Sequence, residues 1–167
     1  KERVGCEELV RDVARLAEPE AGIRDIEISV ETQTGLPDVS VDAVQIQQVV
    51  LNLLRNGMEA MQSIDCRNGN TIRLQARLRD DSAIEFSVID KGCGVDRNSV
   101  DTLFAPFSTT KKSGMGMGLS ISQAIVRAHG GRIDFCNTDS CGAKFWFTLP
   151  TAKKGNHDGR QTESICR

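Results

Sequence analysis

Glycines, lysines and hydroxyl side chains gather in one stretch, FAPFSTTKKSGMGMGLSISQAIVRAHGG, which runs from Phe104 to Gly131. Three glycines alternate just before an apolar-periodic run, at Gly114, Gly116 and Gly118. Alternate glycines let a backbone approach an anion closely, and the first turn of a helix offers unpaired N–H groups and a positive dipole end. The stretch therefore predicts a phosphate-binding loop that leads into a helix. A solvent-exposed glycine loop with free lysines is the alternative.

A second group of polar side chains lies on a predicted helix that runs from Asp42 to about Met61. Asp42 can cap its N-terminus, and Gln45 stands where a capping box has its second member. Asn52 and Asn56 lie one turn apart, although asparagine competes for backbone hydrogen bonds and disfavours a helix interior. Two stacked amide oxygens can coordinate a hard cation such as magnesium, which also binds substrate phosphates. The alternative is that both amides simply face solvent.

A carboxylate followed by two glycines ends a predicted strand, in the sequence DKGCG. Asp90 can accept a hydrogen bond from an exocyclic amine of a ligand, and Gly92 and Gly94 can wrap a flat ring. An ordinary turn of an aspartate and two glycines has the same residues. The sequence therefore predicts a site for a flat, amine-bearing ligand only if the other two patterns are close to this one.

The composition limits the class of protein. A chain of 167 residues, 39% hydrophobic and 26% charged, is typical of one globular domain with its own core. A net charge of −2 gives no basic excess that would favour nucleic acid as the main partner. No apolar run is long enough to cross a bilayer, and the first residues lack the apolar core of a signal peptide. We therefore expect a soluble, cytoplasmic domain.

The cysteines and histidines do not have the spacing of a zinc site. Six cysteines contain no CxxC pair, and the two histidines stand at no ligand spacing to them. Reduced thiols in a reducing compartment are favoured over a disulfide framework, because a chain of this length can build its own core. His129 is expected in the last turn of a helix, where a cation near the negative dipole end is favourable, so a capping role is preferred to catalysis.

Hydrophobic periodicity predicts the elements that must position these residues. Helices are expected over 7–17, ending ahead of Pro19, over 42–61, over the short segment 98–104, and over 119–128. The last of these has an expected core stripe of Leu119, Ile121, Ala124, Ile125 and Ala128 and ends at Gly130 and Gly131. Strands are expected over 26–30, 71–78, 83–90, 132–137 and 143–150, with Ile133, Phe135, Phe145, Phe147 and Leu149 pointing inward. The second and third strands are expected to be antiparallel neighbours, and the last two flank the turn from Thr138 to Gly142.

Three motifs in one order carry a resemblance to a known family. They are NLLRNGMEAM (52–61), DKGCGV (90–95) and FAPFSTTKKSGMGMGLS (104–120), followed by GAKFWFTLP. The stretch from Leu9 to Pro150 resembles the ATP-binding catalytic domain of a bacterial sensor histidine kinase. The segments NLLRNGMEAM and GLSISQAIVRAHGG are most similar to those of the nitrogen-regulation and oxygen-sensing kinases. The wider superfamily includes gyrase, chaperone and mismatch-repair ATPases.

The resemblance implies a fold and a domain organisation. The implied fold is α+β, a two-layer sandwich of a mixed, mostly antiparallel five-stranded sheet and three main helices, with an ATP lid, known as the Bergerat-type fold. It would occupy residues 1–150, with 151–167 as a disordered tail or linker, because that end is almost free of apolar residues. The implied cofactors are ATP and Mg²⁺.

The resemblance also implies a role for each matching residue. Asn56 would be the magnesium ligand, assisted by Asn52, which would polarise the reacting phosphate end or its water. Asp90 would bind the adenine amine, with Gly92 and Gly94 forming the slot for the base. Phe104 and Phe107 would anchor the lid. The phosphates would be bound by the side chains of Thr110 and Lys111 and by backbone N–H groups of Gly114, Gly116, Gly118 and Leu119. Asn52, Asn56 and Lys111 are thus the expected catalytic residues.

The chain departs from the family pattern in three places, one of which is the pair Met115 and Met117 around Gly116, where threonine and leucine are commoner. Glu59 stands where many of these kinases have a lysine, so positive charge near the phosphates is expected from Lys111, Lys112 or Arg55. Gly57 replaces the usual alanine, which costs up to about 1 kcal/mol of helix propensity.

The phosphoryl acceptor is the most consequential gap. A histidine kinase transfers the γ-phosphoryl group to a histidine on a dimeric helical domain, and no such helix pair precedes Glu7. The expected partners are therefore a dimerisation and phosphoacceptor domain of the same homodimeric kinase and a downstream response regulator, with no nucleic acid. An ATP-hydrolysing relative is an alternative, although Asn52 replaces the glutamate that acts as its base. A nucleotide-binding module without transfer activity is another.

Overall fold

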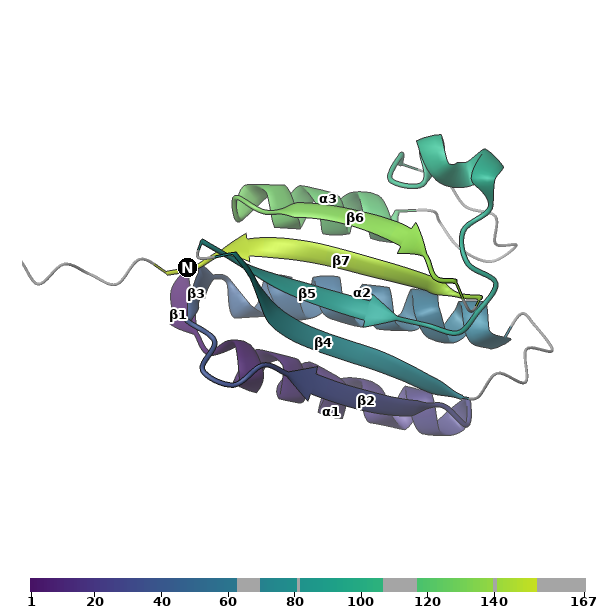
Figure 1. Cartoon of the computed structure of the whole chain (residues 1–167), viewed down its shortest axis with the longest axis horizontal. Helices are drawn as coiled ribbons and strands as arrows, with labels where there is room; N and C mark the ends of the chain where they lie inside the picture. The colour runs from purple at the N-terminus through teal and green to yellow at the C-terminus, as the bar shows by residue number, and fades with distance from the viewer. Residues whose placement is uncertain (63–69, 81, 107–116, 140, 153–167) are drawn as a thin grey trace, which may run out of the picture.

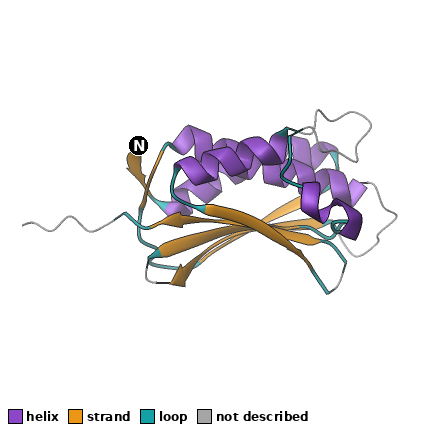
Figure 2. Ribbon diagram, turned by 90° about the horizontal axis from the view of Figure 1, so that it is seen from above, coloured by secondary structure: helices purple, strands orange, loops and turns teal. Residues whose placement is uncertain are grey.

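Helices pack on one face of a five-stranded sheet in the computed structural model, which describes residues 1–62, 70–80, 82–106, 117–139 and 141–152 (Figure 1, Figure 2). The helices are α1 (Cys6–Ile23), α2 (Ala43–Gln62) and α3 (Gly118–Ala128). The strands, in their order across the sheet, are β2 (Glu27–Thr32), β4 (Thr71–Asp80), β5 (Ala83–Ile89), β7 (Ala143–Pro150) and β6 (Arg132–Asn137). Only β2 and β4 pair in parallel, so the expected two-layer α+β architecture is confirmed.

Alternation with a period of two places the apolar side chains of the strands against the helices. Ile84, Phe86 and Val88 of β5 are buried, as are the expected inward residues of β6 and β7 except Phe135, which is partly buried. The rings of Phe86 and Phe147 stack with their centroids 5.1 Å apart. Truncating either ring to alanine would cost about 3 to 5 kcal/mol, because it would leave a cavity in the middle of the sheet.

The first helix is longer than its sequence predicts. α1 continues through Pro19 to Ile23, whereas an end ahead of Pro19 was expected. Proline removes one helical hydrogen bond and crowds the preceding turn. Here Pro19 is exposed, while Ala17 and Ala21 on either side of it are buried in the core. The tertiary packing of those alanines keeps the helix continuous.

A second, two-stranded sheet lies beside the N-terminus of the chain and has no clear sequence signal. β1 (Glu2–Val4) pairs antiparallel with β3 (Val39–Val41), and both strands are too short to show a period. Thr151 forms a bridge with Val39, and the N–H of Ala152 donates to the carbonyl of Asp38 at 2.7 Å. The sheet hydrogen bonds therefore continue past residue 150, the end that the sequence suggested, and residues 153–167 lie outside the described residues.

The short helix before the phosphate loop is a 3-10 helix, η1 (Arg97–Thr102), rather than a segment over 98–104. The Oδ1 atom of Asp96 caps it by accepting the N–H of Asn98 at 3.1 Å. The cap fixes the start of the helix at the loop that follows Asp90. Figure 1 shows η1 near the C-terminal end of β6 and the N-terminal end of α3.

The N-terminus of α2 and the C-terminus of α3 are joined by His129. The expected cap is present, because the N–H of Gln45 donates to Oδ1 of Asp42 at 3.1 Å. The N–H of Asp42, however, donates to Nε2 of His129 at 3.1 Å instead of to the Gln45 side chain. Nδ1 of His129 lies 2.8 Å from the carbonyl of Ile125. The imidazole ring thus links the two helix ends, and the capping position expected of His129 is confirmed, because it is the residue that ends α3.

Candidate nucleotide-binding site

Asp90 follows the last residue of β5 and is 2% exposed. Its Oδ1 accepts the N–H of Gly92 at 2.8 Å and the N–H of Ala143 at 3.3 Å. In the described part of the chain no group donates to Oδ2. Burial raises the pKa of this carboxyl above its ordinary value, although hydrogen bonds from the backbone oppose the shift. The strand end therefore holds a sheltered acceptor, as the sequence predicted, with one oxygen fixed and one available.

Glycines surround Asp90 because backbone approaches it from several sides. A β-carbon at Gly92 would lie 2.7 Å from the carbonyl carbon of Ala60 in α2, and Gly94 adopts a positive φ of 74°. A β-carbon at Gly142, in the β6–β7 turn, would collide with the carbonyl oxygen of Asp90. Gly92 and Gly94 are thus at the expected place, and their observed contacts are with the protein itself. Gly142 was missed, because a turn glycine gives no sequence sign of its distant neighbour.

The surroundings of Gly57 explain why glycine stands where the family usually has alanine. A β-carbon there would lie 2.6 Å from Cδ1 of Ile72 and 3.2 Å from Cβ of Asp90. The same β-carbon would be 3.6 Å from Oδ2 of Asp90, the oxygen without a donor. The absence of a side chain at Gly57 therefore makes room for Ile72 and avoids a close contact with Asp90. The loss of helix propensity at this position is offset by packing.

Asn52 and Asn56 are half-buried on one side of α2, one turn apart, as the sequence predicted. Nδ2 of Asn52 donates to Oγ of Ser122 in α3 at 3.0 Å. A β-carbon at Gly118, the first residue of α3, would collide with Oδ1 of Asn52. The first turn of α3 is therefore placed against the asparagine pair. Ser122 was missed as a site residue, because the sequence expected apolar residues on the buried face of this helix.

The buried face of α3 differs from the expected stripe. Ser122 and Val126 are buried, Leu119 and Ile125 are partly buried, and Ile121 is 44% exposed. Ala124 and Ala128 are exposed as well, so three of the five expected core positions were wrong. The helix is rotated so that Ser122 faces Asn52, a polar contact that periodicity cannot show. Leu119 and Gly118 remain at the N-terminus of the helix, where their N–H groups were expected to bind phosphate.

Phe104, which precedes the expected phosphate loop, packs against the sheet. It is partly buried against the core, and its ring centroid is 6.5 Å from that of Phe135 in β6. This contact fits the expected anchor of the lid. The remaining expected lid residues lie outside the described residues, so their roles stay predictions: Phe107, Thr110, Lys111, Gly114 and Gly116.

Arg55 is not a source of positive charge for the phosphates. Its Nε donates to Oε2 of Glu20 in α1 at 2.9 Å, and Glu20 also binds Arg24 at 3.0 Å. Arg55 therefore faces α1, on a different side of α2 from Asn52 and Asn56. The expectation that named it together with Lys111 and Lys112 is wrong for this residue, because its helical position turns it away from the site.

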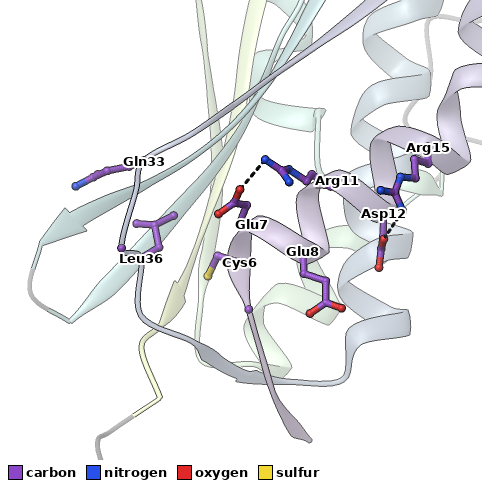
Figure 3. Close-up of a pocket in the computed structure, with 10 residues that line it drawn as sticks. Cys6, Glu7, Glu8, Arg11, Asp12, Arg15, Gln33 and Leu36 are labelled. Atoms are coloured by element: carbon purple, nitrogen blue, oxygen red, sulfur yellow. Dashed lines mark ion pairs between the residues drawn. The ribbon is translucent and has the colours of Figure 1, made fainter.

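A hollow of about 670 Å³ near the N-terminal end of α1 is separate from these residues (Figure 3). Four of the charged side chains that line it form pairs, Arg11 with Glu7 at 2.7 Å and Arg15 with Asp12 at 3.7 Å. Burial raises the pKa of the Cys6 thiol to about 12, so Cys6 is not a nucleophile. The size of this hollow therefore gives no argument for a ligand, in contrast to the chemistry around Asp90.

Residues 41–153 match the family model described as Histidine kinase-, DNA gyrase B-, and HSP90-like ATPase. Sensor protein FixL of Bradyrhizobium diazoefficiens is 40% identical over 144 residues, which cover 86% of this chain and 28% of the relative. Signal transduction histidine-protein kinase AtoS of Escherichia coli (strain K12) is 34% identical over 155 residues, which cover 93% of this chain and 25% of the relative. The chain thus spans about a quarter of the length of these relatives.

Solved structures resemble the whole described fold. Full-length ShkA in complex with AMPPNP aligns with a TM-score of 0.78 and 31% identity over 90% of this chain and 31% of that chain. The nucleotide-free catalytic domain of histidine kinase ThkA aligns with a TM-score of 0.76 and 30% identity over 89% of this chain and 94% of that domain. Among the described residues, no helix is long and apolar enough to span a membrane.

Proposed function

The chain belongs to the histidine kinase-, DNA gyrase B- and HSP90-like ATPase family, as an ATP-binding catalytic domain of the sensor histidine kinase type, and on this premise we propose how it works. It binds ATP with Mg²⁺ and donates the γ-phosphoryl group to a histidine of a separate dimerisation and phosphoacceptor domain. The chain spans only about a quarter of the length of these relatives, which leaves room in a full-length kinase for such a domain. A response regulator then receives the group.

Asp90 supports the proposal at the adenine end of the nucleotide. Its Oδ1 accepts two backbone N–H groups, and Oδ2 lies beside Gly57 and has no donor among the described residues. A buried carboxylate with one available oxygen favours a ligand that brings a donor, and the exocyclic amine of adenine is such a donor. Guanine presents a carbonyl at the corresponding position and would be repelled. The arrangement therefore supports ATP as the nucleotide.

Asn52 and Asn56 of α2 support the proposal at the phosphate end of the nucleotide. Their oxygens are hard ligands one turn apart, which fits Mg²⁺, so Asn56 and Asn52 would hold the metal. Magnesium, when bound, neutralises charge on the phosphates. The N-terminus of α3 lies against Asn52, so the N–H groups of Gly118 and Leu119 are available to the same phosphates. Asn52 is a poor base, which favours transfer to an outside nucleophile over hydrolysis by water.

Labelled ATP tests the proposal. The chain alone is expected to bind ATP and scarcely consume it, because the acceptor histidine is proposed to lie on a separate domain and Asn52 is a poor base for water. Addition of the matching acceptor domain should produce a label that acid removes, as phosphohistidine requires. Transfer should be weak, since the tether that raises effective concentration is absent. Fast turnover by the chain alone would instead identify an ATP hydrolase, and an acid-stable label would identify a serine kinase.

A further inference from the structure

Ser122 is buried at a position where the amphipathic pattern of α3 leads one to expect an apolar side chain. It is 2% exposed, whereas the neighbouring Ile121 is 44% exposed. Burying a hydroxyl without a partner costs about 1 to 3 kcal/mol, so a helix that buries serine and exposes isoleucine needs a compensating contact. Local rules that are broken in this way point to a functional position.

The compensating contact is Asn52, which is unusual in its own helix. Its Nδ2 donates to Oγ of Ser122 at 3.0 Å. Asparagine in a helix interior and serine in a helix core are each unfavourable alone. Together they form a hydrogen bond between α2 and α3. Each anomaly is therefore explained by the other.

Both the nitrogen and the oxygen of the Asn52 amide contact α3. Its nitrogen contacts Ser122, and its oxygen lies against Gly118, one turn earlier in α3. Any side chain at Gly118 would displace that oxygen. The contact thus directs the oxygen toward the N-terminus of α3 and away from the helix interior. This is the side where N–H groups would meet phosphate.

We propose that Ser122 is a positioning residue for Asn52, holding the amide so that its oxygen is presented at the N-terminus of α3 beside the phosphates. The inference rests on the proposed function. Because α3 directly follows the glycine-rich loop in sequence, the same bond links the placement of α3 to the orientation of a side chain on α2. Asn52 is then correctly oriented only when α3 is in place.

A double-mutant cycle in the full-length kinase tests this inference, with Asn52→Ala, Ser122→Ala and the double variant. The readouts are the rate of phosphoryl transfer at saturating ATP, the affinities for magnesium ATP and magnesium ADP, and the free energy of unfolding. Ser122→Ala should slow transfer about 3- to 10-fold, the effect of one lost hydrogen bond, with little change in ADP affinity. In the Asn52→Ala background it should add nothing, because Ser122 acts through Asn52.

Two further variants separate positioning from packing. Ser87→Ala is the matched control, since Ser87 is equally buried, at 1% exposure, on the other face of the sheet and bonds Gln75 instead. It should leave transfer unchanged. Ser122→Thr keeps the hydroxyl and should retain most of the rate. Equal effects of Ser122→Ala in both backgrounds, or no effect in either, would overturn the inference while Asn52→Ala still impairs transfer. A wild-type protein that neither binds ATP nor transfers phosphate would overturn the proposed function itself.

Discussion

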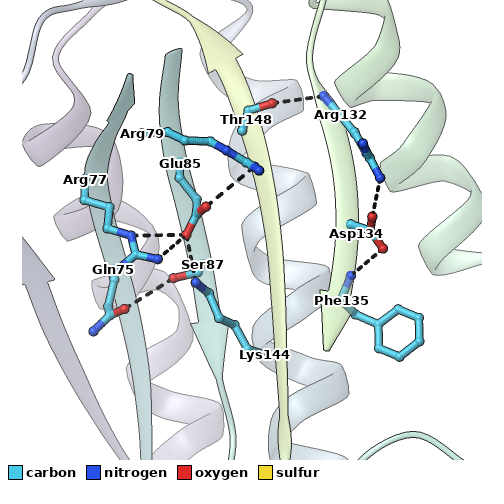
Figure 4. Close-up of polar contacts among 10 residues, drawn as sticks. All are labelled: Gln75, Arg77, Arg79, Glu85, Ser87, Arg132, Asp134, Phe135, Lys144 and Thr148. Atoms are coloured by element: carbon cyan, nitrogen blue, oxygen red, sulfur yellow. Dashed lines mark hydrogen bonds and ion pairs between the residues drawn. The ribbon is translucent and has the colours of Figure 1, made fainter. Parts of the chain in front are cut away.

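Two buried carboxylates on one strand show how different surroundings give the same chemical group opposite properties. Glu85 of β5, 6% exposed, lies on the face of the sheet away from the helices and binds Arg77 and Lys144 at 2.8 Å each (Figure 4). Arg79 approaches it at 3.7 Å. Asp90, just beyond the end of the same strand, has only backbone N–H partners among the described residues.

The pKa values follow this difference. Burial would raise the pKa of Glu85, but hydrogen bonds from Lys144 and Arg77 outweigh it and hold the pKa below the ordinary value. Burial raises the pKa of Asp90, and no cation opposes it in the described part of the chain. Glu85 is a carboxylate satisfied within the protein, and it stabilises the sheet. Under the proposed function Asp90 is the carboxylate that binds the ligand, and its ionisation opposes folding.

Asp90→Asn gives the largest expected effect. The substitution keeps an oxygen for the N–H groups of Gly92 and Ala143 and turns the available acceptor into a donor. Affinity for ATP should fall by about 1 to 3 kcal/mol, roughly 5- to 150-fold, as measured by calorimetry. The free energy of unfolding without nucleotide should be unchanged or higher at neutral pH, because a buried charge is removed. Equal ATP affinity would contradict the role of Asp90.

Glu85→Gln should have the reverse outcome. It leaves Arg77 and Lys144 without their carboxylate and should lower the free energy of unfolding by about 1 to 2 kcal/mol, a value reduced because Arg77 is half exposed. ATP affinity should not change. Urea titration measures the stability and calorimetry the binding. A variant that loses ATP affinity without losing stability would break the contrast between the two carboxylates.

The pH dependence of stability should separate the same two residues. The stabilisation by Glu85 is present above its ordinary pKa of 4.5 and is lost as pH falls toward its lowered folded value. The contribution of Asp90 is most favourable below 3.8 and is lost as pH rises through its raised folded value. In urea unfolding across this range, Glu85→Gln should flatten the loss of stability in acid. Asp90→Asn should gain over wild type as pH rises.

Two helical glycines give the smallest and most local test. Gly57→Ala should destabilise the domain by about 1 kcal/mol or more and weaken ATP binding, because the methyl group meets Ile72 and presses on Asp90. Gly22→Ala in α1 is the control, since its β-carbon would have no atom within 4 Å apart from its chain neighbours and the backbone of its own helix, and it should stabilise by about 0.4 to 1 kcal/mol. Adding Ile72→Val to Gly57→Ala should recover part of the stability. If thermal unfolding shows the two alanine variants to be equal, the tight packing beside Asp90 is absent.

Features that depend on residues close together in the chain could be predicted from the sequence alone. Apolar residues at a period of two produced the hairpin of β4 and β5, and the Asp42 cap with a period of 3.6 produced α2 almost to the residue. Asp90 was recognisable because a strand end followed by glycines is a local pattern. Its role in a nucleotide site came from the order of three motifs along the chain.

Features that depend on distant partners could be found only in the three-dimensional packing. α1 continues through Pro19 because buried alanines on both sides hold it, and Arg55 turns from the phosphates because Glu20 of another helix binds it. Ser122 is buried because Asn52, seventy residues earlier, supplies its hydrogen bond. Periodicity measures how apolar a helix face is, and it contains no term for a polar pair formed between two helices. Such a pair becomes favourable only once both helices are packed, which is why the contact beside the candidate site had to be found in the structure.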